Sequence, residues 1–137
     1  FGRNAYARHD YEEVEKDGAQ SLMEALGKRL PDMTGQSLGS KTVAYADSFS
    51  YTDPIDGSVS ENQGLRIGFA DGSRVVYRLS GTGTKGATLR VYLESFTENA
   101  ADFSVSAHEL LKPIAELAKE TAQIGHYTGR TEPSVIT

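Results

Sequence analysis

The stretch RLSGTGTKGATLR, residues 78–90, combines residue types that suit the binding of an anion. Its glycines follow the pattern Gly81-x-Gly83-x-x-Gly86, a spacing shared by several unrelated phosphate-binding loops. Glycines let the backbone approach a ligand and turn its N–H groups inward, as in an anion nest. Hydroxyl groups between them add further hydrogen-bond donors, at Ser80, Thr82 and Thr84.

Two arginines flank this loop, and strand periodicity predicts that they face each other. Apolar residues alternate on both sides of the loop, so two paired strands with Leu79 opposite Leu89 would place Arg78 directly across from Arg90. Both would point away from the core. Like charges directly opposite each other destabilise a sheet, and a bound dianion would offset that cost. No acidic residue lies between Asp71 and Glu94, so we expect a local positive field in this stretch.

Three known glycine-rich loops fail on context. A Walker A loop needs Gly-Lys-Ser/Thr, but the order is Lys85-Gly86-Ala87. A dinucleotide-binding loop opens a helix, whereas TLRVYL is a strand pattern. A kinase needs H-R-D and D-F-G motifs downstream, and neither occurs. From the residues alone, an anion-binding loop and a hairpin tip with solvated arginines both remain open.

The elements that must position this loop are a sheet and two helices. Residues 42–51 alternate as a half-buried strand, with Val43, Tyr45, Phe49 and Tyr51 on one parity. Three further strands carry core residues on odd positions, which predicts a three-residue connection at 70–72 with Gly72 left-handed. Those core residues are Leu65, Ile67, Phe69, Val75, Tyr77, Leu79, Leu89, Val91 and Leu93.

Helical spacing appears at both ends of the chain. Asp10 and Glu13 resemble a capping pattern, followed by a stripe of Tyr11, Val14, Gly18, Leu22, Leu26 and Leu30 that Pro31 ends. A second stripe runs from Leu110 to Ile124, with a capping box at Ser106 and Glu109, Pro113 inside it and Gly125 as its stop. The order helix, four strands, helix predicts an α+β fold with a four-stranded antiparallel sheet and flanking helices. Val135 and Ile136 favour docking of the last residues on that sheet.

Bulk properties narrow the class of protein. The chain has 137 residues, enough for one domain covering 1–137, and its net charge of −5 argues against binding to nucleic acid. It contains no cysteine, which excludes disulfides and thiolate metal sites. No apolar run is long enough to cross a membrane, and the first residues do not form a secretory signal. We expect a segment of a longer cytoplasmic protein.

The sequence predicts no metal site of its own. Asp53 and Asp56 lie in a turn-rich loop, where Asp-Pro and Asp-Gly are ordinary turn residues. The three histidines, His9, His108 and His126, have no mutual spacing that suits metal ligands.

The chain resembles the C-terminal domains of the α-D-phosphohexomutase superfamily, on its phosphoglucomutase branch. Four segments carry the likeness: FGRNAYARHDYEEVE at the start, the run from residue 53 to 96, TGRTEPSVIT at the end and, more loosely, the helix before it. Arg-Leu-Ser-Gly-Thr-Gly followed by Gly-Ala-Thr and an arginine is the most specific part. At Thr84-Lys85 the chain departs from the family, and we expect Lys85 to be solvated at the loop tip.

The resemblance implies a four-domain enzyme of which this chain is the fourth domain, with a fold like the TATA-box-binding protein. It implies interconversion of glucose 1-phosphate and glucose 6-phosphate through glucose 1,6-bisphosphate, with Mg²⁺ and a phosphoserine held by other domains of the chain. The fourth domain would hold the phosphate that is not reacting and would have no catalytic residue, so the segment alone should be inactive. Carried over by position, the phosphate ligands would be Arg78, Ser80, Gly81, Thr82, Gly83 and Arg90.

The resemblance also admits three other functions. One is a non-enzymatic, parafusin-like relative that serves as a structural or secretory scaffold. Another is a phosphohexomutase that acts on a different sugar. The third is an anion-binding module of some other assembly. No nucleic acid and no membrane is expected as a partner in any of them.

Overall fold

The computed structural model describes residues 3–50, 63–83, 86–97 and 106–137, and it is an α+β fold. Within these ranges the strands are β1 (Arg3–Val14), β2 (Ser37–Leu38), β3 (Lys41–Ser50), β4 (Gln63–Phe69), β5 (Arg74–Gly83), β6 (Gly86–Thr97) and β7 (Val135–Ile136). The helices are α1 (Lys16–Arg29), the 3₁₀ turn η1 (Leu30–Asp32), α2 (Ala107–Ala122) and α3 (Ile124–Thr128).

The strands form one antiparallel sheet in the order β2-β3-β4-β5-β6-β1-β7. Among the described residues the sheet therefore has seven strands, and the prediction of four was wrong. The three additional strands are the long β1, which pairs with β6, and the two-residue β2 and β7, which form the two edges of the sheet. The antiparallel α+β class is confirmed, and the docking of Val135 and Ile136 is confirmed because β7 pairs with β1.

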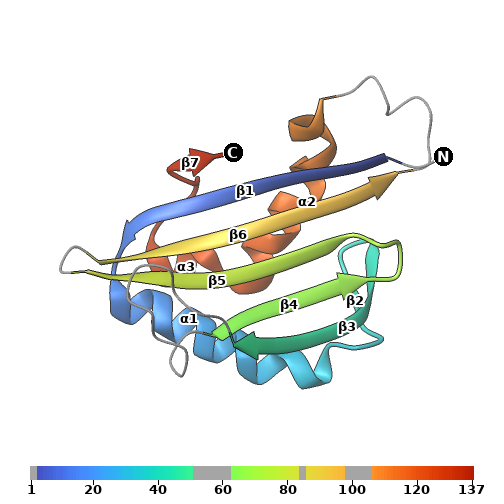
Figure 1. Ribbon diagram of the computed structural model, residues 1–137. Helices are drawn as coiled ribbons and strands as arrows, with labels where there is room; N and C mark the ends of the chain where they lie inside the picture. Colours follow the sequence, from blue (N-terminus) through green and yellow to red (C-terminus); the bar gives the residue numbers. More distant parts are fainter. Residues whose placement is uncertain (1–2, 51–62, 84–85, 98–105) are drawn as a thin grey trace.

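All described helices cover one face of the sheet (Figure 1). Helix α1 packs against β4, β5 and β6, and α2 packs against β1 and β6. We call the other face, which carries Arg74, Arg78 and Arg90, the open face. The predicted core residues of β4, β5 and β6 are buried against the helices, except Leu79, which is half-buried and packs on the edge of the core.

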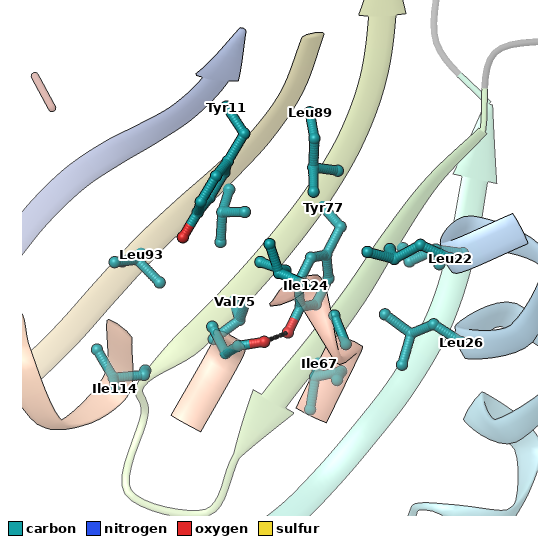
Figure 2. Packing of buried hydrophobic residues seen from close by; sticks show 14 of the residues in the cluster. Tyr11, Leu22, Leu26, Ile67, Val75, Tyr77, Leu89, Leu93, Ile114 and Ile124 are labelled. Atoms are coloured by element: carbon teal, nitrogen blue, oxygen red, sulfur yellow. Dashed lines mark hydrogen bonds between the residues drawn. The ribbon is translucent and has the colours of Figure 1, made fainter. Parts of the chain in front are cut away.

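A tyrosine hydroxyl joins the sheet to α2 inside the core. The Tyr77 hydroxyl donates to the Ala118 carbonyl at 2.8 Å, and Figure 2 shows it among apolar residues from both layers. Burial raises the pKa of Tyr77 well above its usual range and raises that of Tyr11 to about 12. Both phenols therefore stay protonated at neutral pH, and Tyr77 remains a donor.

The first predicted helix was wrong over Asp10–Val14, which belong to β1. The register between β1 and β6 shifts between Tyr11 and Val14, and Glu13 adopts a φ of 55°. This irregularity buries two residues that are three positions apart, a spacing that imitates one turn of a helix. Helix α1 begins only at Lys16, and its N-cap Glu15 makes no side-chain capping bond.

A similar shift in β3 overturned the predicted parity of that strand. Val43 is buried, but the register shifts before Tyr45, which is 42% exposed, and Ala46 takes its place against the core. On the open face the rings of Tyr45 and Phe49 lie over Gly68 and Gly64, where an added Cβ would collide with them. Tyr51 lies outside the described residues.

The predicted turn and cap were mostly confirmed. The Phe69 N–H donates to the Ser73 carbonyl at 2.9 Å, which closes a three-residue loop at 70–72 as predicted. Gly72 has a φ of 89°, and its N–H donates to the Phe69 carbonyl at 3.0 Å. Ser106 caps α2 by accepting from the Glu109 N–H at 3.2 Å. The stop at Gly125 was wrong, because Gln123 takes the left-handed conformation and ends α2 first.

Replacing Tyr77 with phenylalanine tests the bond between the layers. Tyr77→Phe should lower the free energy of unfolding by about 1 kcal/mol, because the buried Ala118 carbonyl loses a donor. Denaturant unfolding measures the change, with Tyr6→Phe as the control, since Tyr6 is 62% exposed. Equal losses in the two variants would contradict the assigned role.

Candidate functional site: an arginine pair at the glycine-rich loop

Arg78 and Arg90 are direct cross-strand partners on β5 and β6, as predicted. Their sequence neighbours Tyr77, Leu89 and Val91 are buried against the helices, so both arginines project from the open face. Both are only partly buried. Two positive charges therefore stand side by side at the start of the glycine-rich loop.

An aromatic ring supports the first of these arginines. The Arg78 guanidinium carbon lies 5.7 Å from the centroid of the Tyr92 ring, within the range of a cation–π contact. Its Nη1 also reaches the Tyr92 hydroxyl at 3.5 Å, which is long for a hydrogen bond. Of these two contacts between Arg78 and Tyr92, the cation–π contact is therefore the stronger.

A serine and a carboxylate hold the second arginine. Nη1 of Arg90 donates to Oγ of Ser80 at 2.9 Å, and Nε of Arg90 lies 3.9 Å from Oδ1 of Asp10. Ser80 is buried and accepts this bond, so its own hydroxyl proton can still be donated to a ligand. The structure thus brings Arg78, Ser80 and Arg90 together.

Asp10 is the residue that sequence reasoning missed. It lies on β1 in register with Arg90, it is 5% exposed, and its Oδ1 is 3.0 Å from Nε of Arg8. The capping pattern with Glu13 predicts a helix start at Asp10, and this prediction is wrong. The signal was the alternation of Ala5, Ala7 and Tyr11, on the core side, with polar residues at Arg8, Asp10 and Glu12.

Carboxylates from other parts of the chain make the positive field smaller than predicted. Glu94 pairs with Arg74 at 3.1 Å, and Asp10 lies near both Arg90 and Arg8. Asp10 thus carries one negative charge against the positive charges of Arg8 and Arg90, so positive charge is still in excess around the loop. Lys85, which we expect to be solvated at the loop tip, and Thr84 lie outside the described residues.

The loop leaves β5 at Gly83 and enters β6 at Gly86, and these two residues are paired after a shift in register. Gly86 has a φ of 98°, and a Cβ there would lie 2.6 Å from the Val14 carbonyl oxygen. Glycine is required at Gly86 by both its conformation and this contact. Gly81, Thr82 and Gly83 continue β5.

Arg130 and Ser134 brace the end of β1 against which Gly86 packs. Nη2 of Arg130 donates to the carbonyls of Glu12 at 2.8 Å and Glu13 at 3.1 Å. Oγ of Ser134 accepts from the Glu12 N–H at 3.1 Å and from Arg130 at 3.3 Å. The segment before β7 thereby holds the left-handed Glu13 and, through Val14, the base of the loop.

A hollow of about 420 Å³ adjoins the arginine pair on the open face. Two of its lining residues belong to the surroundings of the pair: Tyr92, which supports Arg78, and Arg8, which lies beside Asp10. Tyr6, Arg74 and Glu94 line its other side.

No group of three His, Asp or Glu side chains that could hold a metal ion occurs among the described residues. His126 stacks edge-on against Tyr127, with ring centroids 4.8 Å apart. Asp53 and Asp56 lie outside the described residues. The described helices are all too short or too polar to span a membrane.

Comparison with known proteins gives consistent matches over the whole chain. A family model described as the C-terminal domain of phosphoglucomutase-1 matches residues 3–134. Over its full length the chain is 49% identical to the phosphoglucomutase of Rhizobium radiobacter and covers 25% of it. It is 46% identical to the chloroplastic phosphoglucomutase of Arabidopsis thaliana, covering 22%, and 46% identical to rabbit phosphoglucomutase-1, covering 25%.

A solved structure matches in the same way. The open form of the exocytosis-sensitive phosphoprotein pp63/parafusin (phosphoglucomutase) from Paramecium superposes with a TM-score of 0.77 at 42% identity. The match covers 98% of this chain and 23% of that one. The chain thus spans about a quarter of the length of the relatives it matches.

Substitution of Gly86 tests the contact between the loop and β1. Gly86→Ala should destabilise the protein by about 1–3 kcal/mol, because it combines an unfavourable φ with a collision against backbone. Gly35→Ala is the matched control, since Gly35 has a φ of 87° but nothing within 4 Å of its added Cβ. Denaturant unfolding should show a larger loss for Gly86→Ala, and equal losses would mean that the Val14 contact is unimportant.

Proposed function

The chain belongs to the family of phosphoglucomutase-1 C-terminal domains, and on that premise we propose that it binds the non-reacting phosphate of a phosphosugar in a phosphoglucomutase. The reaction is the interconversion of glucose 1-phosphate and glucose 6-phosphate through glucose 1,6-bisphosphate. The ligands are Arg78, Ser80, Gly81, Thr82, Gly83 and Arg90. Three other domains of the same protein supply the phosphoryl donor and the Mg²⁺ site, and the domain shares the fold of the TATA-box-binding protein.

The observation that carries this proposal is the arginine pair with Ser80 at the start of the loop. Guanidinium groups present several N–H donors in a plane, which suits the oxygens of a phosphate dianion. One dianion between Arg78 and Arg90 would remove the repulsion that their register imposes. The Ser80 hydroxyl proton and the backbone N–H groups of the glycine-rich stretch add neutral donors to the same ligand.

These groups position a substrate and transfer no proton. Arginine stays protonated at all physiological pH values, so neither Arg78 nor Arg90 can act as a general base. Their contribution is to fix the distal phosphate so that the other end of the sugar is aligned with the phosphoryl donor. A grip that recognises only a dianion also accepts both orientations of a bisphosphate, which the reaction through glucose 1,6-bisphosphate requires.

Mg²⁺ has no ligand cluster among the described residues, so no step is assigned to it in this domain. A cytoplasmic location stays a prediction, since the matched plant enzymes are named chloroplastic.

The likeness to parafusin favours a second candidate, a role in exocytosis without catalysis. That relative is named both an exocytosis-sensitive phosphoprotein and a phosphoglucomutase. The two candidates differ in turnover: full-length protein that binds phosphate but does not convert glucose 1-phosphate would support the scaffold.

The arginine pair is tested by Arg78→Gln in the full-length protein. Loss of a charge-assisted contact worth about 2–3 kcal/mol should lower kcat/KM roughly thirty- to two-hundredfold, with KM raised and kcat lowered. Steady-state kinetics with glucose 1-phosphate measure both constants.

Arg74→Gln is the matched control for that experiment. Arg74 lies on the same strand and the same face, but it is paired with Glu94, and an exposed ion pair of this kind contributes little. Arg74→Gln should leave kcat/KM within about twofold of the wild type. Equal effects of the two variants would remove Arg78 from the proposed site.

The chain of residues 1–137 alone should show no phosphoglucomutase turnover. Positioning groups cannot replace the phosphoryl donor, which we assign to another domain. A coupled assay for glucose 6-phosphate on the purified chain measures this, with a catalytically competent full-length preparation as the positive control. Turnover that stays with the chain through further purification would contradict the assignment.

A further inference from the structure

The side chain of Asp10 projects from the open face of the sheet, yet it is buried. Its neighbours along β1, Arg8 and Glu12, are more exposed, whereas its own side chain is only 7% accessible. Strand β7 covers it from the edge, because Val135 pairs with Asp10 and the Ser134 N–H donates to the Asp10 carbonyl at 2.8 Å. A charge buried in this way is costly unless charges around it compensate.

Two guanidinium groups supply that compensation. Oδ1 of Asp10 lies 3.0 Å from Nε of Arg8 and 3.9 Å from Nε of Arg90. These three atoms are buried and none has a hydrogen-bond partner, so the attraction between them is that of close charges without aligned hydrogen bonds. The carboxylate is therefore held by its two arginines, and it holds them in return.

Two groups contact the guanidinium of Arg90 from different sides. Ser80 accepts a hydrogen bond from its Nη1, and the Asp10 carboxylate attracts its Nε across 3.9 Å. The remaining N–H groups of a guanidinium fork are then free of these two partners and can be directed to a ligand. Fixing a side chain before binding reduces the entropy that binding would otherwise cost.

We propose that Asp10 is a positioning residue for the phosphate site: it orients Arg90 and balances its charge while no anion is bound. The inference rests on the proposed function, since it assigns Asp10 a role in that same site. Asp10 does not touch the phosphate, and like charge would disfavour such a contact. It acts on the ligand only through Arg90.

The direction in which Asp10→Asn changes the affinity for phosphate separates this role from a purely electrostatic effect of the carboxylate. Asp10→Asn keeps the shape of the side chain and removes a negative charge near the anion. If Asp10 acted only through its field, phosphate would bind more tightly to the variant. If Asp10 positions Arg90, phosphate should bind about tenfold more weakly, in the range of coupling between residues in contact.

The experiment is a double-mutant cycle in the full-length protein, with inorganic phosphate as the probe. Dissociation constants are measured for wild type, Asp10→Asn, Arg90→Gln and the double variant, with melting temperatures recorded without phosphate. We expect the loss caused by Asp10→Asn to disappear in the Arg90→Gln background. If the role of Asp10 were purely structural, Asp10→Asn would weaken phosphate binding both in the wild type and in the Arg90→Gln variant.

Glu94→Gln is the matched control. It removes one negative charge from the same face of the sheet, but its partner is Arg74. It should leave the dissociation constant unchanged or lower it slightly. Should Asp10→Asn fail to fold, Asp10→Ser replaces it in the same cycle.

The outcomes separate the two proposals. Wild type that binds no phosphate, or Arg90→Gln that binds as well as wild type, would overturn the proposed function and this inference with it. Arg90→Gln that loses affinity while Asp10→Asn keeps or gains it would overturn only the role of Asp10.

Discussion

The register between β5 and β6 is the constraint on which the rest of the site depends. It sets Leu79 against Leu89 on the face that packs on the helices, and so places Arg78 against Arg90 on the open face. A shift by one residue would exchange the two faces, so the apolar packing and the arginine pair cannot vary independently. The repulsion between the arginines is the consequence of this coupling, and Tyr92, Ser80 and Asp10 are the groups that offset it.

The position of the glycine-rich loop is set by the same pair of strands and by the end of β1. Gly86 packs against the Val14 carbonyl, and the bulge before Val14 is held by Arg130 and Ser134. The loop therefore begins between an arginine pair on one side and a braced strand end on the other. Such support favours ligand binding by the backbone of the loop, because groups that are already in place lose less conformational entropy when the ligand binds.

Sequence reasoning predicted the arginine pair because apolar residues alternate regularly along each of its strands, from Val75 to Leu79 and from Leu89 to Leu93. It failed at β1 and β3, where a register shift breaks the period of two. At Tyr11 and Val14 the break imitates a helix, and at Tyr45 it reverses the face. Because β1 was not predicted as a strand, the place of Asp10 in the site was not predicted either. Its partner Arg90 is far away in sequence, and only the order of the strands brings the two residues together. The two-residue strands β2 and β7 are too short to carry a periodic signal.

The position of β1 has a consequence for synthesis on the ribosome. β1 lies between β6 and β7, so it pairs with two strands that are synthesised after it, β7 at the other end of residues 3–136 (Figure 1). Contacts between such distant segments form slowly, because a long loop must close before they gain anything. Until then the buried half of β1, with Tyr11 and Val14, stays exposed beside an unpaired edge. The nascent chain thus passes through a stage in which aggregation competes with folding, and chaperones that shield early strands would act at that stage.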